Sequence, residues 1–311
     1  MASVRTVTTR PAQALAGPDG RFLDVDGVSV HHRVTGPVDA PTVLLFHHFY
    51  GNVATWRHVH AAVADRYRVV SFDRVGFGLT ERPPRSRWPG TNPYTRQMTT
   101  RIALALLDHL GAPTATLVGS SAGGTAALET YRRAPGRIRG MALLSPAITG
   151  DVGAPRMVRP LLRTWPLRAI GTGIVRRAAG DITRERVSRS WHDPSIAGDD
   201  DVDAYARVMQ VEGWDRGFWE VMTAEAPPDL RDIVRSVQVP TLVVAGASDR
   251  IIRPRWNRRT AEALPDGRFR LLEDTGHTPH QERPDLLVPV LRAFLAELDG
   301  SEGPGVGERV R

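Results

Sequence analysis

Short apolar runs alternate with longer amphipathic stretches along most of this chain. The runs are rich in Val, Leu and Phe, which is typical of strands buried on both faces. They occupy 42–46, 68–72, 114–118, 138–144, 241–245 and 269–272. Helix-like stretches, such as 54–65 and 94–110, separate several of these runs. Strands that alternate with helices predict an α/β fold in which helices cover both faces of a mostly parallel sheet.

Two further elements frame the alternation. Residues 22–34, with the turn-forming pair Asp26-Gly27 in the middle, predict an opening β-hairpin. At the other end, apolar residues at helical spacing predict a closing helix whose inner face is Leu287, Leu291, Phe294 and Leu295.

The alternation stops between 147 and 235, where the pattern predicts several helices and no strand. We therefore divide the chain into a flexible leader, two core segments, an inserted helical cap and a flexible tail. These comprise 1–20, 21–146 with 236–299, 147–235 and 300–311, respectively. The cap contains a Trp and Met cluster that could line a pocket, although aromatic residues at helical spacing more often form core packing.

Composition narrows the class of protein. The 311 residues contain no cysteine, which excludes disulfides, zinc-thiolate sites and thiol nucleophiles. No apolar run is long enough to span a membrane, and the first 20 residues lack the apolar stretch of a secretory signal. We therefore expect a cytoplasmic protein with no membrane partner. We also expect no cofactor. We expect no metal site, because His58 and His60 would point to different sides of their helix.

The net charge of +7 raises the question of nucleic-acid binding. Every basic residue is arginine and none is lysine, so the charge reflects a bias of the whole chain. The arginines are interspersed with acidic and apolar residues, and they accompany no nucleic-acid motif. We therefore expect solvated surface charge and no nucleic-acid partner. The absence of lysine also excludes Schiff-base catalysis and a P-loop lysine.

Gly119-Ser120-Ser121-Ala122-Gly123 is a G-x-S-x-G motif between a predicted strand and a predicted helix. At such a sharp turn the serine hydroxyl stands clear of the backbone, and flanking glycines relieve crowding against neighbouring strands. The N–H groups at the start of the helix favour developing negative charge nearby. The motif predicts that Ser121 is a nucleophile.

A serine nucleophile needs a base, and the base needs a group that orients it. Asp249 follows the run 241–245, and His277 follows the run 269–272. Loops beyond the carboxyl ends of parallel strands converge on one crevice. We therefore expect Ser121, His277 and Asp249 to meet there, with His277 removing the Ser121 proton and Asp249 orienting the imidazole.

Five motifs in this order resemble the α/β-hydrolase family over about 21–300. Besides the three loops above, 43–51 resembles the family's H-G-x oxyanion loop and 72–80 its D-x-x-G-x-G block. The resemblance implies that the backbone N–H groups of Phe49 and Ala122 form an oxyanion hole. It also implies that 147–235 covers the crevice and determines substrate choice.

Several assignments stay open within this resemblance. His48 stands where the family usually has glycine, so it is a possible substrate contact, a hydrogen-bonding support or simply packed. Asp73 could compete as the triad acid, but its context resembles a structural turn; Asp151 is the more serious rival. His280 and Glu282 are interpreted as supports for the His277 loop.

The serine nucleophile favours hydrolysis of a small carboxylic ester, thioester or lactone through an acyl-enzyme. Carbon–carbon bond hydrolysis of diketone-type substrates is the alternative, with perhydrolysis a weaker third. A ligand-binding homologue without activity is the alternative from another class. The expected partner is a small apolar molecule, and a homo-oligomer stays open.

Overall fold

The structure is a computed structural model that describes residues 9–88, 90–148, 157–225, 229–300 and 308–309, of which 178–186 and 309 are described by their backbone alone. Within these residues no helix combines the length and the apolarity needed to cross a lipid bilayer.

The described residues form one nine-stranded sheet with the strand order β1-β2-β4-β3-β5-β6-β7-β8-β9. The strands are β1 Arg21–Val25, β2 Val28–Thr35, β3 Thr42–Phe46, β4 Arg68–Phe72, β5 Ala115–Ser120, β6 Ile138–Leu144, β7 Thr241–Gly246, β8 Gly267–Leu272 and β9 Glu308–Arg309. Neighbouring strands from β4 to β8 pair in parallel, whereas β1, β2 and β9 pair antiparallel at the two edges. The expected α/β architecture is confirmed.

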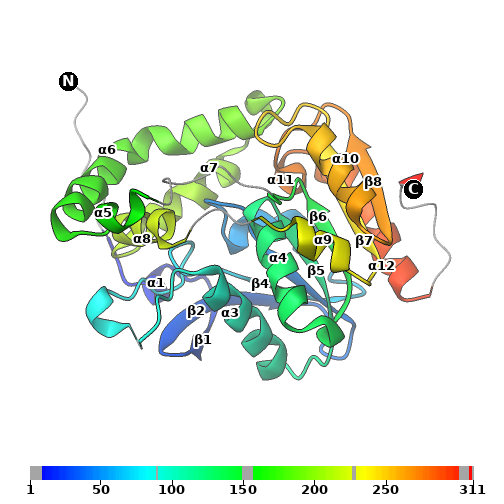
Figure 1. The fold of residues 1–311 in the computed structure, drawn as a ribbon, viewed down its shortest axis with the longest axis horizontal. Helices are drawn as coiled ribbons and strands as arrows, with labels where there is room; N and C mark the ends of the chain where they lie inside the picture. Colours follow the sequence, from blue (N-terminus) through cyan, green and yellow to red (C-terminus); the bar gives the residue numbers. More distant parts are fainter. Residues whose placement is uncertain (1–8, 89, 149–156, 226–228, 301–307, 310–311) are drawn as a thin grey trace.

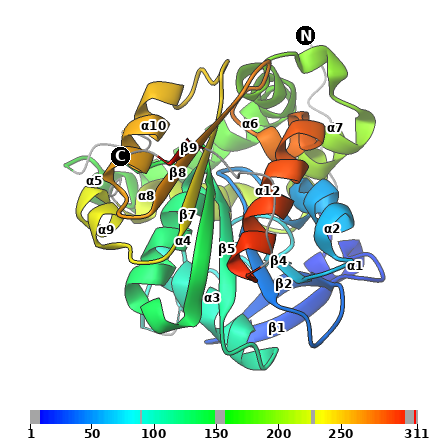
Figure 2. The same cartoon turned by 90° about the vertical axis from the view of Figure 1, so that its right-hand side faces the viewer.

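Helices cover both faces of the sheet (Figures 1 and 2). The helices are α1 Ala12–Leu15, α2 Arg57–Val63, α3 Arg96–His109, α4 Ala122–Arg133, α5 Arg159–Leu162, α6 Trp165–Ser190, α7 Asp199–Ala206, α8 Trp214–Ala224, α9 Arg231–Ser236, α10 Pro254–Ala263, α11 Pro279–Glu282 and α12 Pro284–Leu298. Figure 2 shows α2 and α12 on one side of the sheet and α4, α9 and α10 on the other.

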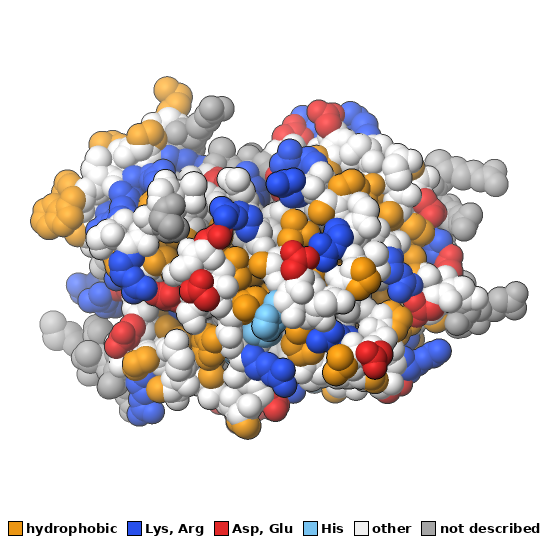
Figure 3. All heavy atoms as spheres, turned by 90° about the horizontal axis from the view of Figure 1, so that it is seen from below, with side chains coloured by type: hydrophobic (Ala, Val, Ile, Leu, Met, Phe, Trp, Pro, Cys, Tyr) orange, Lys and Arg blue, Asp and Glu red, His pale blue; other side chains and the backbone are white. Residues whose placement is uncertain are grey.

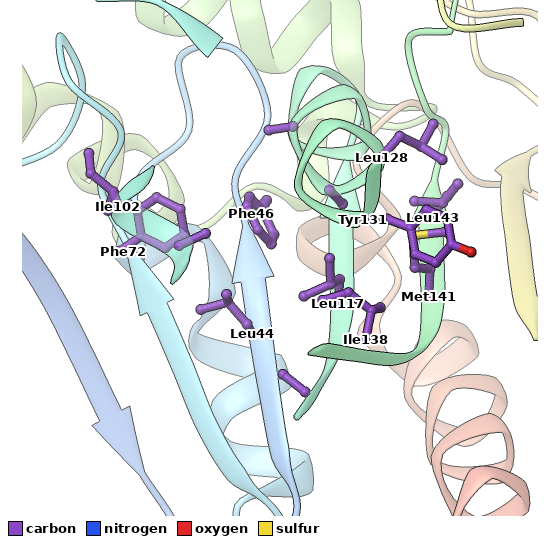
Figure 4. Close-up of a cluster of buried hydrophobic side chains, with 14 of the residues drawn as sticks. Leu44, Phe46, Phe72, Ile102, Leu117, Leu128, Tyr131, Ile138, Met141 and Leu143 are labelled. Atoms are coloured by element: carbon purple, nitrogen blue, oxygen red, sulfur yellow. The ribbon is translucent and has the colours of Figure 1, made fainter. Parts of the chain in front are cut away.

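Each parallel strand contributes side chains to two separate cores because successive residues point to opposite faces. In β3, Leu44 and Phe46 belong to the core beneath α3 and α4 (Figure 4), whereas Val43 and Leu45 belong to the core beneath α2 and α12. This two-sided burial explains why the strands read as continuous apolar runs. It also fixes their register, since a slip of one residue would exchange the two faces.

The predicted hairpin is present as β1 and β2, with Arg21 to Val25 paired antiparallel to 28–32. Its turn residues Asp26 and Gly27 have φ of 53° and 75°. Both residues are therefore left-handed, as a type I′ turn requires, and Asp-Gly is a preferred pair for that turn.

Helices α5 to α8 form a separate layer above the sheet, with α6 running across the top (Figure 1). Part of the aromatic cluster packs within this layer, because Trp214, Phe218 and Trp219 surround Val175. By contrast, Trp165 at the start of α6 is 76% exposed. Core packing therefore accounts for three of the aromatic residues of the inserted segment.

Described residues near both ends of the chain make backbone contacts with distant segments. Among the described leader residues, Arg10 donates its backbone N–H to Gln210 O at 2.8 Å and accepts from Glu212 N at 3.2 Å. Near the other end, Glu308 and Arg309 pair with the edge strand β8. These backbone contacts with distant segments have no local sequence signal.

Candidate active site

Ser121 lies at the sharp turn between β5 and α4, with φ of 51° and ψ of −116°. Such backbone angles are strained for a residue with a side chain and persist only where the surroundings enforce them. A Cβ on Gly123 would lie 2.0 Å from Phe46 O, and a Cβ on Gly119 would lie 2.6 Å from Gly123 O. The two glycines therefore allow α4 to begin directly against the sheet, as the G-x-S-x-G motif predicts.

Asp249 and His277 are brought together by the loops that follow β7 and β8. His277 Nδ1 lies 2.8 Å from Asp249 Oδ2, and both side chains are buried. The second carboxylate oxygen, Oδ1, accepts the backbone N–H groups of Ile251 at 2.8 Å and Ile252 at 2.9 Å. Because both carboxylate oxygens have donors, the carboxylate is fixed in the orientation that holds the imidazole.

Ser121 and His277 occupy the same edge of the sheet, since each follows the carboxyl end of a parallel strand. Among the described residues, Ser121 Oγ makes no hydrogen bond, including to His277. The structure thus brings the expected acid and base into contact and leaves the expected nucleophile without a partner in the described part of the chain. Contacts of this kind often tighten only when substrate binds.

The loop after β3 directs the Phe49 amide through hydrogen bonds to the preceding carbonyl. His48 O accepts from His47 Nδ1 at 2.7 Å and from Arg74 Nη2 at 3.1 Å. In a planar trans peptide the C=O and the N–H point in opposite directions. These two donors, together with the Gly51 N–H that donates to His48 O at 2.9 Å, therefore also set the direction of the Phe49 N–H.

Both amides expected in the oxyanion hole are available. The N–H groups of Phe49 and Ala122 have no protein acceptor within the described ranges, and the two residues line one cavity with Ser121. Donors already in place for a developing oxyanion lower the barrier of acyl transfer. The local geometry is therefore suited to stabilising negative charge beside Ser121.

The His48 ring lies outside that cavity lining and contacts other protein groups. Its Nδ1 is 2.8 Å from Phe49 O, and its Nε2 is 3.1 Å from Gln281 and 3.3 Å from the Tyr205 hydroxyl. Burial lowers the pKa of His48 to about 4, so the ring is neutral at pH 7. This placement favours the interpretation of a supporting hydrogen bond over a substrate contact.

The neutral state of the His48 ring determines which of its nitrogens donates a hydrogen bond and which accepts one. A neutral ring that donates from Nδ1 to Phe49 O can only accept at Nε2. As placed, Gln281 Oε1 faces the ring and accepts from the Tyr205 hydroxyl at 2.7 Å, so two acceptors would meet at Nε2. Turning the carboxamide brings its NH₂ group to the ring and frees the Tyr205 proton for Nε2. Among the loop residues described, the positive φ falls at Tyr50, with 71°, so His48 avoids the backbone strain that its position suggests.

Replacing His48 with glycine should lower kcat by about tenfold and change KM little. The variant loses a support of the Phe49 peptide, and a full oxyanion donor is worth about 10²–10³. Steady-state kinetics on an ester would check this. A raised KM at unchanged kcat would instead identify the ring as a substrate contact.

Asp73 is the centre of a buried turn. Its carboxylate accepts from His31 Nδ1, from Val53 N and from Leu79 N, each at 2.7 Å. These bonds support the structural interpretation of Asp73. The rival Asp151 lies outside the described residues.

Glu282 connects the His277 loop to the end of α6. It accepts backbone N–H groups from Gly276 at 2.6 Å, His192 at 2.5 Å and Asp193 at 3.1 Å. Burial raises the pKa of Glu282, while these hydrogen bonds oppose the rise. His280 contributes by stacking on Trp56, with ring centroids 4.3 Å apart. Both residues have the supporting positions that the sequence predicts.

We expect Glu282→Gln to lower the free energy of unfolding by about 1–3 kcal/mol, because its NH₂ group cannot accept the N–H bonds that a carboxylate oxygen accepts. Chemical denaturation would measure the loss. Glu273→Gln, an exposed change in the same loop, should leave stability within about 0.5 kcal/mol. Equal stability of the two variants would contradict this role of Glu282.

The cavity beside Ser121 has a volume of about 1140 Å³. Its lining also includes Arg74, Phe77, Val221 and Met222, so one member of the aromatic and methionine cluster does face it. This volume is ample for a small organic molecule.

No cluster of three or more His, Cys, Asp or Glu residues suited to a metal ion occurs in the described part of the chain. His60 is instead held between Thr35 Oγ1 at 2.7 Å and Ser71 Oγ at 2.8 Å. Arginine and acidic side chains are interspersed over the face in Figure 3. That face does not resemble a continuous basic surface.

Three residues at the site were not assigned a role by sequence reasoning: Arg74, Tyr205 and Gln281. Arg74 lies within the motif at 72–80 and Gln281 lies four residues after His277, but neither residue type carries a functional signal. Tyr205 approaches from α7, and only tertiary structure brings it to the loop after β3.

Comparison with known proteins agrees with this architecture. The sequence profile of the alpha/beta hydrolase fold matches residues 41–284. YugF, an uncharacterised hydrolase of Bacillus subtilis, is 27% identical over 289 residues, covering 88% of this chain and 97% of YugF. A 2-hydroxymuconate semialdehyde hydrolase of Pseudomonas putida is 27% identical, covering 75% of this chain and 78% of that protein. A solved esterase of Thermogutta terrifontis has a TM-score of 0.72 at 24% identity, covering 90% of this chain and 98% of the esterase.

Because the profile match extends over most of the sequence, the chain belongs to the α/β-hydrolase family. It is a hydrolase with the sheet and helices of that fold.

Proposed function

We propose that the chain is a serine hydrolase that cleaves a small carboxylic ester, thioester or lactone through an acyl-Ser121 intermediate. The observation that carries this proposal is the buried Asp249–His277 pair, 2.8 Å apart, at the sheet edge that also carries the strained Ser121 turn. The backbone angles of this turn cost free energy, and such strain is usually kept only at functional sites. Here the turn places Ser121 in the lining of the cavity.

In the proposed first step, His277 Nε2 takes the proton of Ser121 while Oγ forms a bond to the substrate carbonyl carbon. The carbonyl oxygen gains the negative charge, which the N–H groups of Phe49 and Ala122 stabilise. The bond to the leaving oxygen or sulfur then breaks, and His277 returns the proton to the leaving group. Asp249 stays ionised and balances the imidazolium.

In the second step, water replaces the leaving group. His277 removes a proton from water as its oxygen attacks the acyl-Ser121 carbon, and the same two amides stabilise the second oxyanion. The Ser121–acyl bond breaks, and His277 protonates Ser121 Oγ. The products of this step are the free acid and the regenerated enzyme, so the proposed reaction consumes only substrate and water.

Incubation with p-nitrophenyl esters of short and medium chain length, together with a fluorophosphonate probe, tests the proposal. Turnover and a covalent adduct on the peptide that contains Ser121 are the expected results. An unlabelled protein without esterase activity would support a ligand-binding homologue.

The second candidate is hydrolysis of a carbon–carbon bond in a diketone-type substrate. The relative of Pseudomonas putida named for such a substrate favours including it. Loss of the absorbance of a conjugated 2-hydroxy-6-oxo acid would detect this reaction directly. A kcat/KM that exceeds every ester tested would make it the main activity.

A further inference from the structure

Arg74 is a buried cation in the cavity that contains Ser121. It follows β4, is 9% exposed and lines the same cavity as Ser121 and Ala122. Its Nη2 donates to His48 O, but Nε is buried and has no partner in the described structure, and Nη1 also makes no hydrogen bond there. The guanidinium also lies over the Phe77 ring, 5.0 Å from its centroid, so the Nη1 end is the part left for a ligand in the cavity.

No carboxylate compensates this charge among the described residues. Three other arginines of the cavity lining differ, because Arg96 pairs with Glu225 at 3.1 Å, Arg231 with Asp229, and Arg235 with Asp232 at 3.4 Å. Arg259 has no carboxylate partner in the described structure, but its side chain is exposed to solvent. Burial lowers the pKa of Arg74 to about 10, so the group still carries its proton at pH 7. A buried cation without an anion is costly, and proteins normally pair or hydrogen-bond such groups fully.

We propose that the substrate of the Ser121 site carries a carboxylate in its acyl part and that this carboxylate binds Arg74. This inference rests on the proposed serine hydrolase function and specifies its substrate class. A guanidinium is suited to this role because its planar donors match the two oxygens of a carboxylate.

The strand order assigns the carboxylate to the acyl part. β4 lies on one side of β5, beyond β3, whereas β7 and β8 lie on the other side. His277 must protonate the leaving group, so the leaving group occupies the β8 side of Ser121. The acyl chain then extends toward the β4 side, where Arg74 and the aromatic ring of Phe77 lie. The substrate therefore combines an apolar body with one terminal negative charge.

The test compares paired substrates whose terminal carboxylate is either free and charged or capped as a neutral methyl ester. The p-nitrophenyl esters of hydrogen adipate and hydrogen suberate carry a terminal carboxylate, and their monomethyl esters are neutral counterparts. After subtraction of spontaneous hydrolysis, we expect the wild type to prefer one of the acids by about tenfold to a hundredfold in kcat/KM, the worth of a charge-assisted hydrogen bond.

Variants of Arg74 identify the origin of the preference. Arg74→Gln should lower turnover of both substrates, because the His48 carbonyl loses a donor, and should also bring the ratio between acid and methyl ester close to one. Arg74→Lys keeps the charge but loses the planar donors, so part of the preference should survive. Arg259→Gln, which removes an exposed arginine from the same cavity lining, should keep the wild-type ratio.

Three outcomes would overturn the inference: a wild type without preference for the acids, an unchanged ratio in Arg74→Gln, or an equal loss in Arg259→Gln. The wild-type comparison decides even if an Arg74 variant fails to fold. Turnover of the neutral esters that requires Ser121, without preference for acids, would leave the proposed function intact. Absence of turnover for all esters would instead contradict the proposed function.

Discussion

Ser121→Ala should abolish both ester turnover and fluorophosphonate labelling, with kcat falling by on the order of 10⁴–10⁶. The variant removes the atom that forms the acyl-enzyme, while the cavity and both backbone amides stay in place. Substrate should therefore still bind, so KM or a binding constant should change far less than kcat. Stopped-time assays at high enzyme concentration and mass spectrometry of the labelled protein would measure the two effects.

The neighbouring serine provides a matched control. Ser120 ends β5, is fully buried and has a hydroxyl without a partner among the described residues. Ser120→Ala makes the same chemical change one residue away and should keep both labelling and turnover within about threefold. Residual turnover in Ser121→Ala close to the wild-type rate would mean that another nucleophile acts.

Asp249→Asn should lower kcat by about 10⁴ with little change in stability. The carboxamide can still accept the N–H groups of Ile251 and Ile252. Its NH₂ group can, however, face His277 Nδ1 and stabilise the tautomer that carries the proton on Nε2. That tautomer cannot accept the Ser121 proton. Steady-state kinetics and thermal unfolding of the purified variant would separate the two effects.

Two further substitutions test whether the loss of activity in Asp249→Asn is specific to Asp249. Asp274→Asn makes the same change at an exposed position of the His277 loop, where a φ of 47° suits asparagine. It should keep the wild-type activity within about twofold. Asp151→Asn tests the rival acid: if it abolishes turnover while Asp249→Asn does not, the assignment of Asp249 is wrong.

The central sheet was predictable because its strands are buried on both faces. The runs at 42–46, 68–72 and 138–144 coincide with β3, β4 and β6. Two-sided burial demands apolar residues at every position, and this gives each strand a signal with sharp ends. The strained serine turn was predictable for a similar reason, since the glycines at 119 and 123 are required by close backbone approach.

The surroundings of His48 were not predictable. The sequence placed a bulky ring where glycine is usual, which suggested strain or a substrate contact. In the structure, Tyr50, two residues after His48, takes the left-handed conformation, and the His48 ring contacts Tyr205 and Gln281. These partners lie 157 and 233 residues away in sequence, so no local pattern could indicate them. The same holds for the contacts of Arg10.

The hydrogen bonds among His48, Tyr205 and Gln281 join the loop after β3, the inserted helices and the segment after His277. A displacement of α7 away from the sheet would withdraw the Tyr205 hydroxyl and loosen the ring beside the Phe49 amide. In the proposed mechanism, the position of α7 is thereby coupled to the readiness of the Phe49 amide, although no α7 residue lines the cavity beside Ser121. Substitutions that shift α7 would then weaken stabilisation of the transition state without touching the substrate.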